Sequence, residues 1–234
     1  MVGRVQRLVE HALIEQVPRD HHQPDSAFRR RRIVSAVTIA VGTTLLGFSL
    51  ATDPGDAAFY PITAAVAVVW VIGGLLSGPL HLGYIPFRGA LRRPIVTPIA
   101  LGLAAGAVFV VGALIVREIE PLRVFTSHVL AHATQGNLAI VTVLALANGI
   151  AEEVFFRGAL FAAIGRRHPV LISTVIYTLV TIATQNPMLV FAALLMGTLF
   201  ALQRRASGGI LASMLTHVIW STILILALPP IIDK

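Results

Sequence analysis

Two adjacent carboxylates, Glu152 and Glu153, lie with Arg157 inside the apolar run 148–158. An ionisable group at the centre of a membrane costs about 2.5–3.5 kcal/mol even on insertion scales, so such a residue marks a functional site. Glu153 and Arg157 are four residues apart, a spacing that places them on one helix face and predicts an ion pair. Glu152 lies about 100° further round the helix, where it is free to face a cavity and act as a general base or acid. The alternative is a helix end with interfacial acids and an arginine that extends to the headgroups.

A second candidate is His217, the one histidine within the long apolar stretches, with Ser221 one turn later on the same face. Its simplest role is a hydrogen bond between helices. Because the glutamate pair stands on a different apolar stretch, we favour a polar site that the two stretches share.

Other chemistries have less support. The chain contains no cysteine and no His-Glu-x-x-His zinc motif. Asp53 and Asp56 follow an apolar stretch rather than standing within it, which argues against an aspartyl pair. Ser207 comes directly after two arginines and a small residue, as in a loop turn. His128 and His132 are four residues apart but lie between apolar stretches, which favours an interfacial helix face over a metal site.

The composition shows which elements must position these residues. The chain has 234 residues, of which 56% are hydrophobic and 12% charged, with a mean hydropathy of +0.83. Soluble domains carry roughly 25% charged residues, so a soluble enzyme is excluded. We predict an all-α transmembrane bundle of seven to eight helices. The stretches are about 33–51, 57–76, 97–116, 137–157, the segment after Pro169 up to 183, 188–202 and 210–228, and an eighth segment around 77–96 or 124–136 stays open.

The basic residues predict an orientation. The net charge is +7; in a soluble protein this would suggest nucleic acid, but here loop arginines explain it and no nucleic-acid partner is expected. Breaks on one side of the membrane carry three, two and two arginines, and those on the other side are neutral or acidic. We predict a multi-pass plasma-membrane protein with a cytoplasmic basic tail (1–32), N-terminal membrane helices (33–136) and a helical core (137–228). The tail arginines are Arg4, Arg7, Arg19 and Arg29 to Arg32.

The run Glu152–Gly158 resembles the EExxxR signature of the CPBP family. These are intramembrane proteases related to type II CAAX prenyl endopeptidases and to bacteriocin-processing and self-immunity proteins. The resemblance covers roughly residues 138–225. It is supported by the family's Gly-rich helix, basic turn and closing histidine helix, seen here as Met196-Gly197, Arg204-Arg205, Gly208-Gly209, Ala212 and Thr216-His217.

The resemblance implies an endopeptidase that hydrolyses membrane-associated proteins or peptides. It assigns Glu152 as the base that activates water, Glu153 and Arg157 as the pair that holds it, and His217 as an oxyanion donor or metal ligand. Such a mechanism is chemically coherent, because amide hydrolysis needs an activated water and a donor for the developing negative charge.

Two departures from the family pattern affect these roles. The FxxxH motif has no histidine here, and its position is taken by Thr181 or Thr184. The closing HxxxN motif has Ser221 in place of asparagine. The cofactor is therefore undetermined: a divalent metal such as zinc would have Glu152 and His217 as ligands, fewer than the three protein ligands typical of catalytic zinc.

Three functions follow from these residues. The first is the endopeptidase, which we predict. The second is a catalytically silent scaffold or immunity protein, which the missing histidine favours. The third is a proton-coupled transporter that protonates Glu152; the clustered Glu, Arg and His, and the lack of an inverted repeat, argue against it.

Overall fold

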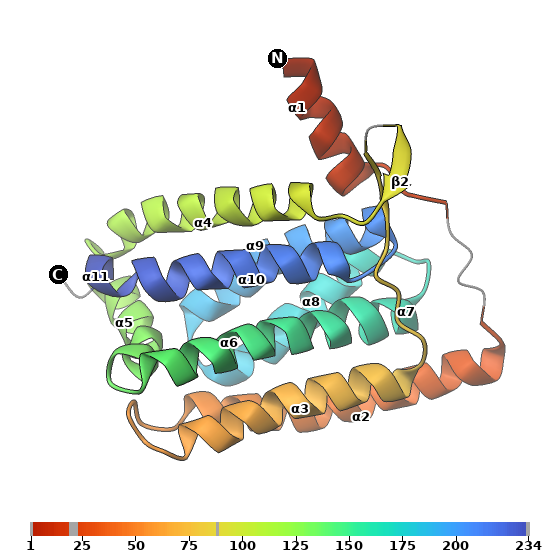
Figure 1. Cartoon of the computed structure of the whole chain (residues 1–234). Coiled ribbons are helices and arrows are strands. Elements are labelled where there is room, and N and C mark those ends of the chain that lie inside the picture. The colour runs from red at the N-terminus through yellow and green to blue at the C-terminus, as the bar shows by residue number, and fades with distance from the viewer. Residues whose placement is uncertain (1, 19–22, 88, 233–234) are drawn as a thin grey trace.

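The computed structural model describes residues 2–18, 23–87 and 89–232 as a helical bundle with one short hairpin (Figure 1). Arg19 and Arg88, two of the arginines used to predict orientation, lie outside these residues. The elements are α1 (Val2–Val9), the π-helix η1 (Glu10–Ile14), α2 (Asp25–Leu50), α3 (Phe59–Ser77), β1 (Ile85–Phe87), β2 (Ala90–Arg92), α4 (Val96–Val116), α5 (Glu120–Thr134), α6 (Leu138–Glu152), the π-helix η2 (Glu153–Leu160), α7 (Phe161–Ile164), α8 (Pro169–Thr181), the 3₁₀ turn η3 (Ile182–Thr184), α9 (Pro187–Ser207), α10 (Leu211–Ala227) and α11 (Pro229–Ile232).

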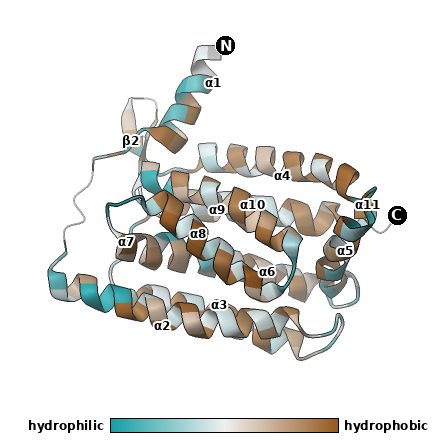
Figure 2. Cartoon of the chain, turned by 180° about the vertical axis from the view of Figure 1, so that it is seen from behind, coloured by the Kyte–Doolittle hydropathy of each residue, from teal (hydrophilic) through white to brown (hydrophobic). Residues whose placement is uncertain are grey.

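The predicted all-α membrane fold is confirmed. Within the described residues, five helical segments are long and apolar enough to cross a membrane: α2, α3, α4, the continuous segment Leu138–Ile164 and α9. Two shorter apolar helices, Pro169–Thr184 and α10, account for the other two predicted stretches. Large apolar side chains face outward, among them Val108, Val143 and Leu171, each more than 60% exposed. Hydrophilic residues gather at the start of α2 and in the loops, and α1 carries both hydrophilic and hydrophobic residues (Figure 2). The chain is an integral multi-pass membrane protein.

Several helix ends differ from the predicted ones. The first long helix begins at Asp25 rather than near residue 33, so the tail arginines 29–32 form its first turns. Arg31 is fully buried, because its guanidinium donates to Ser77 Oγ (3.3 Å) and to the carbonyl oxygen of Pro79 (3.2 Å) just beyond α3. Likewise α9 continues past the predicted end at residue 202 to Ser207. A prediction from hydropathy ends the helix at the first charged residue. The helix itself continues past that residue where a neighbouring element accepts its hydrogen bonds.

The two segments left open as an eighth helix have different structures. Residues 124–136 lie mostly in α5, which crosses one end of the bundle beside α11 (Figure 1). His132 on α5 is buried and its ring stacks on Phe59, with centroids 4.4 Å apart. The region 77–96 contains the hairpin β1–β2, in which Ile85 pairs with Arg92, at the opposite end of the bundle. The cytoplasmic side of the tail, the plasma membrane and the division at residues 32 and 136 stay predictions.

Helices α2 and α3 form a closely packed pair along one side of the bundle (Figure 1). A Cβ added at Gly73 of α3 would lie 2.2 Å from Oγ1 of Thr38 on α2. Small residues at such crossings let two helix backbones approach, which is how helices associate in a membrane.

We therefore expect Gly73→Ala to destabilise the protein by about 1–3 kcal/mol, the usual cost of overpacking. The matched control is Gly112→Ala in α4, where an added Cβ meets no atom within 4 Å and alanine favours the helix. The measurement is the midpoint of thermal unfolding in detergent micelles, followed by circular dichroism. Equal midpoints for the two variants would contradict this account of the α2–α3 crossing.

Candidate active site

The backbone changes from an α-helix to a π-helix between Glu152, the last residue of α6, and Glu153, the first of η2. The wider hydrogen-bond pattern is visible at the end of η2, where the N–H of Phe161 donates to the carbonyl oxygen of Phe156, five residues earlier. Short π-helical turns within α-helices are rare, and those that occur are often found at functional sites. The two candidate glutamates therefore stand where the regular helix ends.

Glu153 and Arg157 form the predicted ion pair. Arg157 Nη1 donates to Glu153 Oε1 at 3.1 Å, and both side chains are at most 1% exposed. Arg157 Nη2 also donates to the carbonyl oxygen of Gly197 on α9 (3.1 Å), and its guanidinium lies 4.5 Å from the ring centroid of Tyr177. The pair thus ties η2 to α8 and α9. A buried ion pair needs such further contacts to offset its loss of hydration.

His217 on α10 contacts the same carboxylate. Its Nδ1 lies 3.2 Å from Glu153 Oε1, and its ring stacks on Phe200 with centroids 4.7 Å apart. The ring also lies against Gly149, where an added Cβ would be 3.2 Å from the imidazole Cδ2. A carboxylate at Nδ1 favours the tautomer with its proton there, which leaves Nε2 as the nitrogen available to a ligand.

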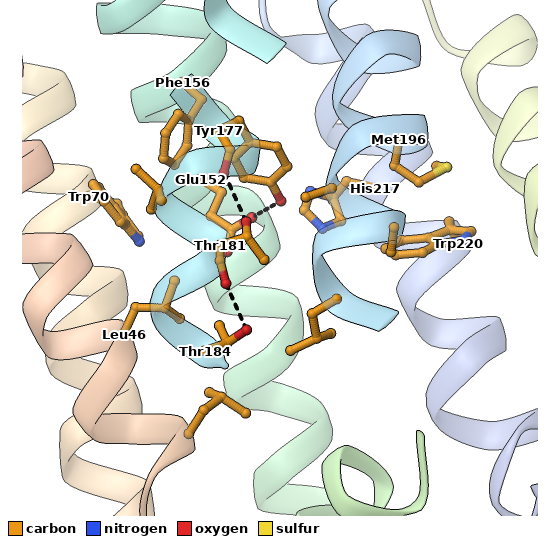
Figure 3. Close-up of a pocket in the computed structure, with 15 residues that line it drawn as sticks. Leu46, Trp70, Glu152, Phe156, Tyr177, Thr181, Thr184, Met196, His217 and Trp220 are labelled. Carbon is orange, nitrogen blue, oxygen red and sulfur yellow. Dashed lines mark hydrogen bonds between the residues drawn. The ribbon is translucent and has the colours of Figure 1, made fainter. Parts of the chain in front are cut away.

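Glu152 faces a cavity of about 170 Å³ between α2, α3, α6, α8, α9 and α10 (Figure 3). The hydroxyl of Tyr177 on α8 donates to Glu152 Oε2 at 2.5 Å. His217 lines the same cavity. The alternative of an interfacial helix end is wrong for these residues, because Glu153 and Arg157 are buried and Glu152 points inward.

The three supporting residues divide into two groups. Thr181 and Thr184 both line the cavity, on the turn of α8 and η3 below Tyr177 (Figure 3). Their hydroxyls donate to the carbonyl oxygens of Tyr177 and Thr181 within the same helix. The oxygen of Thr184 also accepts from the backbone N–H of Asn186 (3.3 Å), whereas the oxygen of Thr181 keeps its lone pairs available as acceptors. Ser221 is half-buried on α10 and is not among the residues that line this cavity.

Tyr177 and Trp70 are among the lining residues that were given no role from the sequence. Tyr177 stands one helical turn before Thr181, a spacing that could have placed it at the site. Trp70 comes from α3, some 80 residues before the glutamates, and nothing in its local sequence distinguishes it from a core aromatic.

Comparison with known proteins adds to this geometry. Residues 134–223 match the model of a family described as type II CAAX prenyl endopeptidase, Rce1-like. This segment is similar to the CAAX protease-like family. The match confirms the resemblance drawn from the EExxxR run and the closing histidine helix. No curated protein and no solved structure matches the chain.

The CAAX protease-like segment carries every residue of the ion pair together with Glu152, Tyr177 and His217. Its donor set does not fit a catalytic zinc ion. Within the described residues, no group of three His, Cys, Asp or Glu side chains could hold a metal. Glu153 is engaged by Arg157 and His217, which leaves one carboxylate and one imidazole nitrogen at the cavity, short of the usual three protein ligands.

Proposed function

We propose that the protein is an intramembrane endopeptidase in which Glu152 activates a water molecule to hydrolyse a peptide bond of a membrane-associated protein or peptide. The observation that carries the proposal is the shared cavity: the carboxylate of Glu152 and the imidazole of His217 line one hollow within the bundle. A carboxylate base and a nearby donor are the two groups that amide hydrolysis by water requires.

The reaction needs only water and the peptide as reactants. Glu152 removes a proton from water as the water oxygen bonds to the carbonyl carbon. The imidazolium form of His217 keeps its Nδ1–H toward Glu153 and donates a hydrogen bond from Nε2–H to the oxyanion that forms. The proton on Glu152 then passes to the amide nitrogen as the C–N bond breaks, which restores the carboxylate. Glu153 and Arg157 position His217 and the helix rather than touching substrate.

The test uses the purified full-length protein in lipid vesicles with a library of fluorogenic, apolar membrane-spanning peptides. We expect cleavage, with one ¹⁸O atom in each new carboxylate when the reaction is run in H₂¹⁸O. A protein that is folded and cleaves no member of the library would contradict the proposal and favour the silent scaffold or immunity protein.

Tyr177 should matter because it donates the one hydrogen bond of the described residues that reaches Glu152. We expect Tyr177→Phe to lower kcat about tenfold to a hundredfold, since a hydrogen bond to a charged group is worth about 1.5–3 kcal/mol. The matched control is Tyr60→Phe, because Tyr60 lies on the far end of α3 and its hydroxyl accepts from the backbone N–H of Asn137. Similar rates for the two variants would show that Tyr177 does not hold the base.

A further inference from the structure

Trp70 has a fixed position beside the cavity. Its side chain is completely buried, and its ring lies against Phe155 and Phe156 with centroids 4.9 and 5.0 Å away. On the other side it lies on α2, where an added Cβ at Gly42 would come within 2.3 Å of the indole Cη2. The ring therefore cannot turn without moving α2 or η2.

The indole N–H of Trp70 has no hydrogen-bond partner among the described residues, although it is buried. Trp70 lines the cavity, and its nitrogen lies at the end of the ring nearest the cavity (Figure 3). A buried donor without an acceptor destabilises a protein, and a phenylalanine would pack here without that cost. The donor is explained if a ligand in the cavity supplies the acceptor.

We propose that Trp70 Nε1 donates a hydrogen bond to a backbone carbonyl oxygen of the peptide substrate, an inference that rests on the proposed function. Trp70 and His217 lie on opposite sides of Glu152 (Figure 3). An extended peptide presents carbonyl oxygens along both of its edges. One carbonyl would then lie at His217, where the bond is cut, and a neighbouring one at Trp70. Trp70 thereby sets the register of the peptide against the base.

The chain contains two tryptophans, so an indole ¹⁵N–¹H spectrum of the full-length protein in micelles has two signals, which the variant Trp220→Phe assigns. The probe is acetyl-leucine N-methylamide, with an alkane of similar size as control. We expect the amide to move the Trp70 signal downfield in a saturable manner, and the alkane not to do so. Trp220 is a matched comparison: it lines the same cavity and its N–H also lacks a partner among the described residues, but its nitrogen is turned away from Glu152 (Figure 3).

A kinetic arm measures the same contact during turnover. We expect Trp70→Phe to raise KM about 3- to 10-fold with kcat changed less than about twofold, as for loss of a neutral hydrogen bond made equally in ground and transition states. Since this variant also leaves a small void, the spectrum of the unaltered protein decides the matter. An unmoved Trp70 signal, or an equal shift at Trp220, would overturn the proposal. If the Trp70 signal shifts but the protein cleaves no peptide, the result would contradict the proposed endopeptidase activity and would support a cavity that binds amides.

Discussion

Replacing Glu152 by glutamine is expected to reduce peptide hydrolysis about 10²- to 10⁴-fold, the usual contribution of a general base. The protein should stay folded, because glutamine has nearly the same shape and its amide oxygen can accept the hydrogen bond that Tyr177 donates to the carboxylate. Glu152 also takes no part in the ion pair with Arg157. The measurement is the initial rate of cleavage in vesicles, together with the thermal unfolding midpoint in micelles.

Glu118→Gln provides the matched control. Glu118 is an exposed acid in the turn after α4, where it pairs with Arg117. The same chemical change there should leave both the rate and the midpoint unaltered, since exposed pairs contribute about 0–1 kcal/mol. Cleavage by the Glu152→Gln protein at the rate of the unchanged chain would remove the glutamate mechanism.

Breaking the ion pair between Glu153 and Arg157 should instead lower the stability of the fold. Either Glu153→Gln or Arg157→Met leaves one charge buried without its partner, which costs about 3–5 kcal/mol. Arg157→Met should be the more severe, because it also removes the contacts with Gly197 and Tyr177. The measurement is the unfolding midpoint of each variant during titration with a denaturing detergent.

The double variant Glu153→Gln, Arg157→Met separates charge from packing. It removes both charges, so it should be more stable than Arg157→Met alone, as when an ion pair is replaced by neutral groups of similar size. If the two single losses simply added in the double variant, the two residues would not be coupled, and the pair would not be what holds η2 to α9.

The membrane helices could be predicted because hydropathy is a local property of the chain. All seven predicted stretches are helical, including α8 and α10, which are shorter than the rest. The ends could not be predicted in the same way. Arg31 lies inside α2 because Ser77 and Pro79 accept its hydrogen bonds, and that contact joins residues 46 and 48 positions apart.

The residues of the site also differ in how well the sequence predicts them. Glu153 and Arg157 are close in sequence, so spacing alone predicts their contact. His217 could be proposed from its type, because an imidazole inside an apolar helix is costly without a role. Trp70 could not be distinguished from a core aromatic until the structure placed it beside the cavity, whereas Tyr177 could have been noticed from its one-turn spacing before Thr181. Ser221 was included by its one-turn spacing from His217, but it does not line the cavity.

Leu46, Leu50 and Trp70 form one wall of the cavity around Glu152. These residues come from α2 and α3, outside the matched segment 134–223. A fragment excised at residue 134 would keep every ionisable group of the centre yet leave Glu152 open to acyl chains on that flank. Grafting the segment onto another scaffold would therefore transfer its reactive groups without their enclosure.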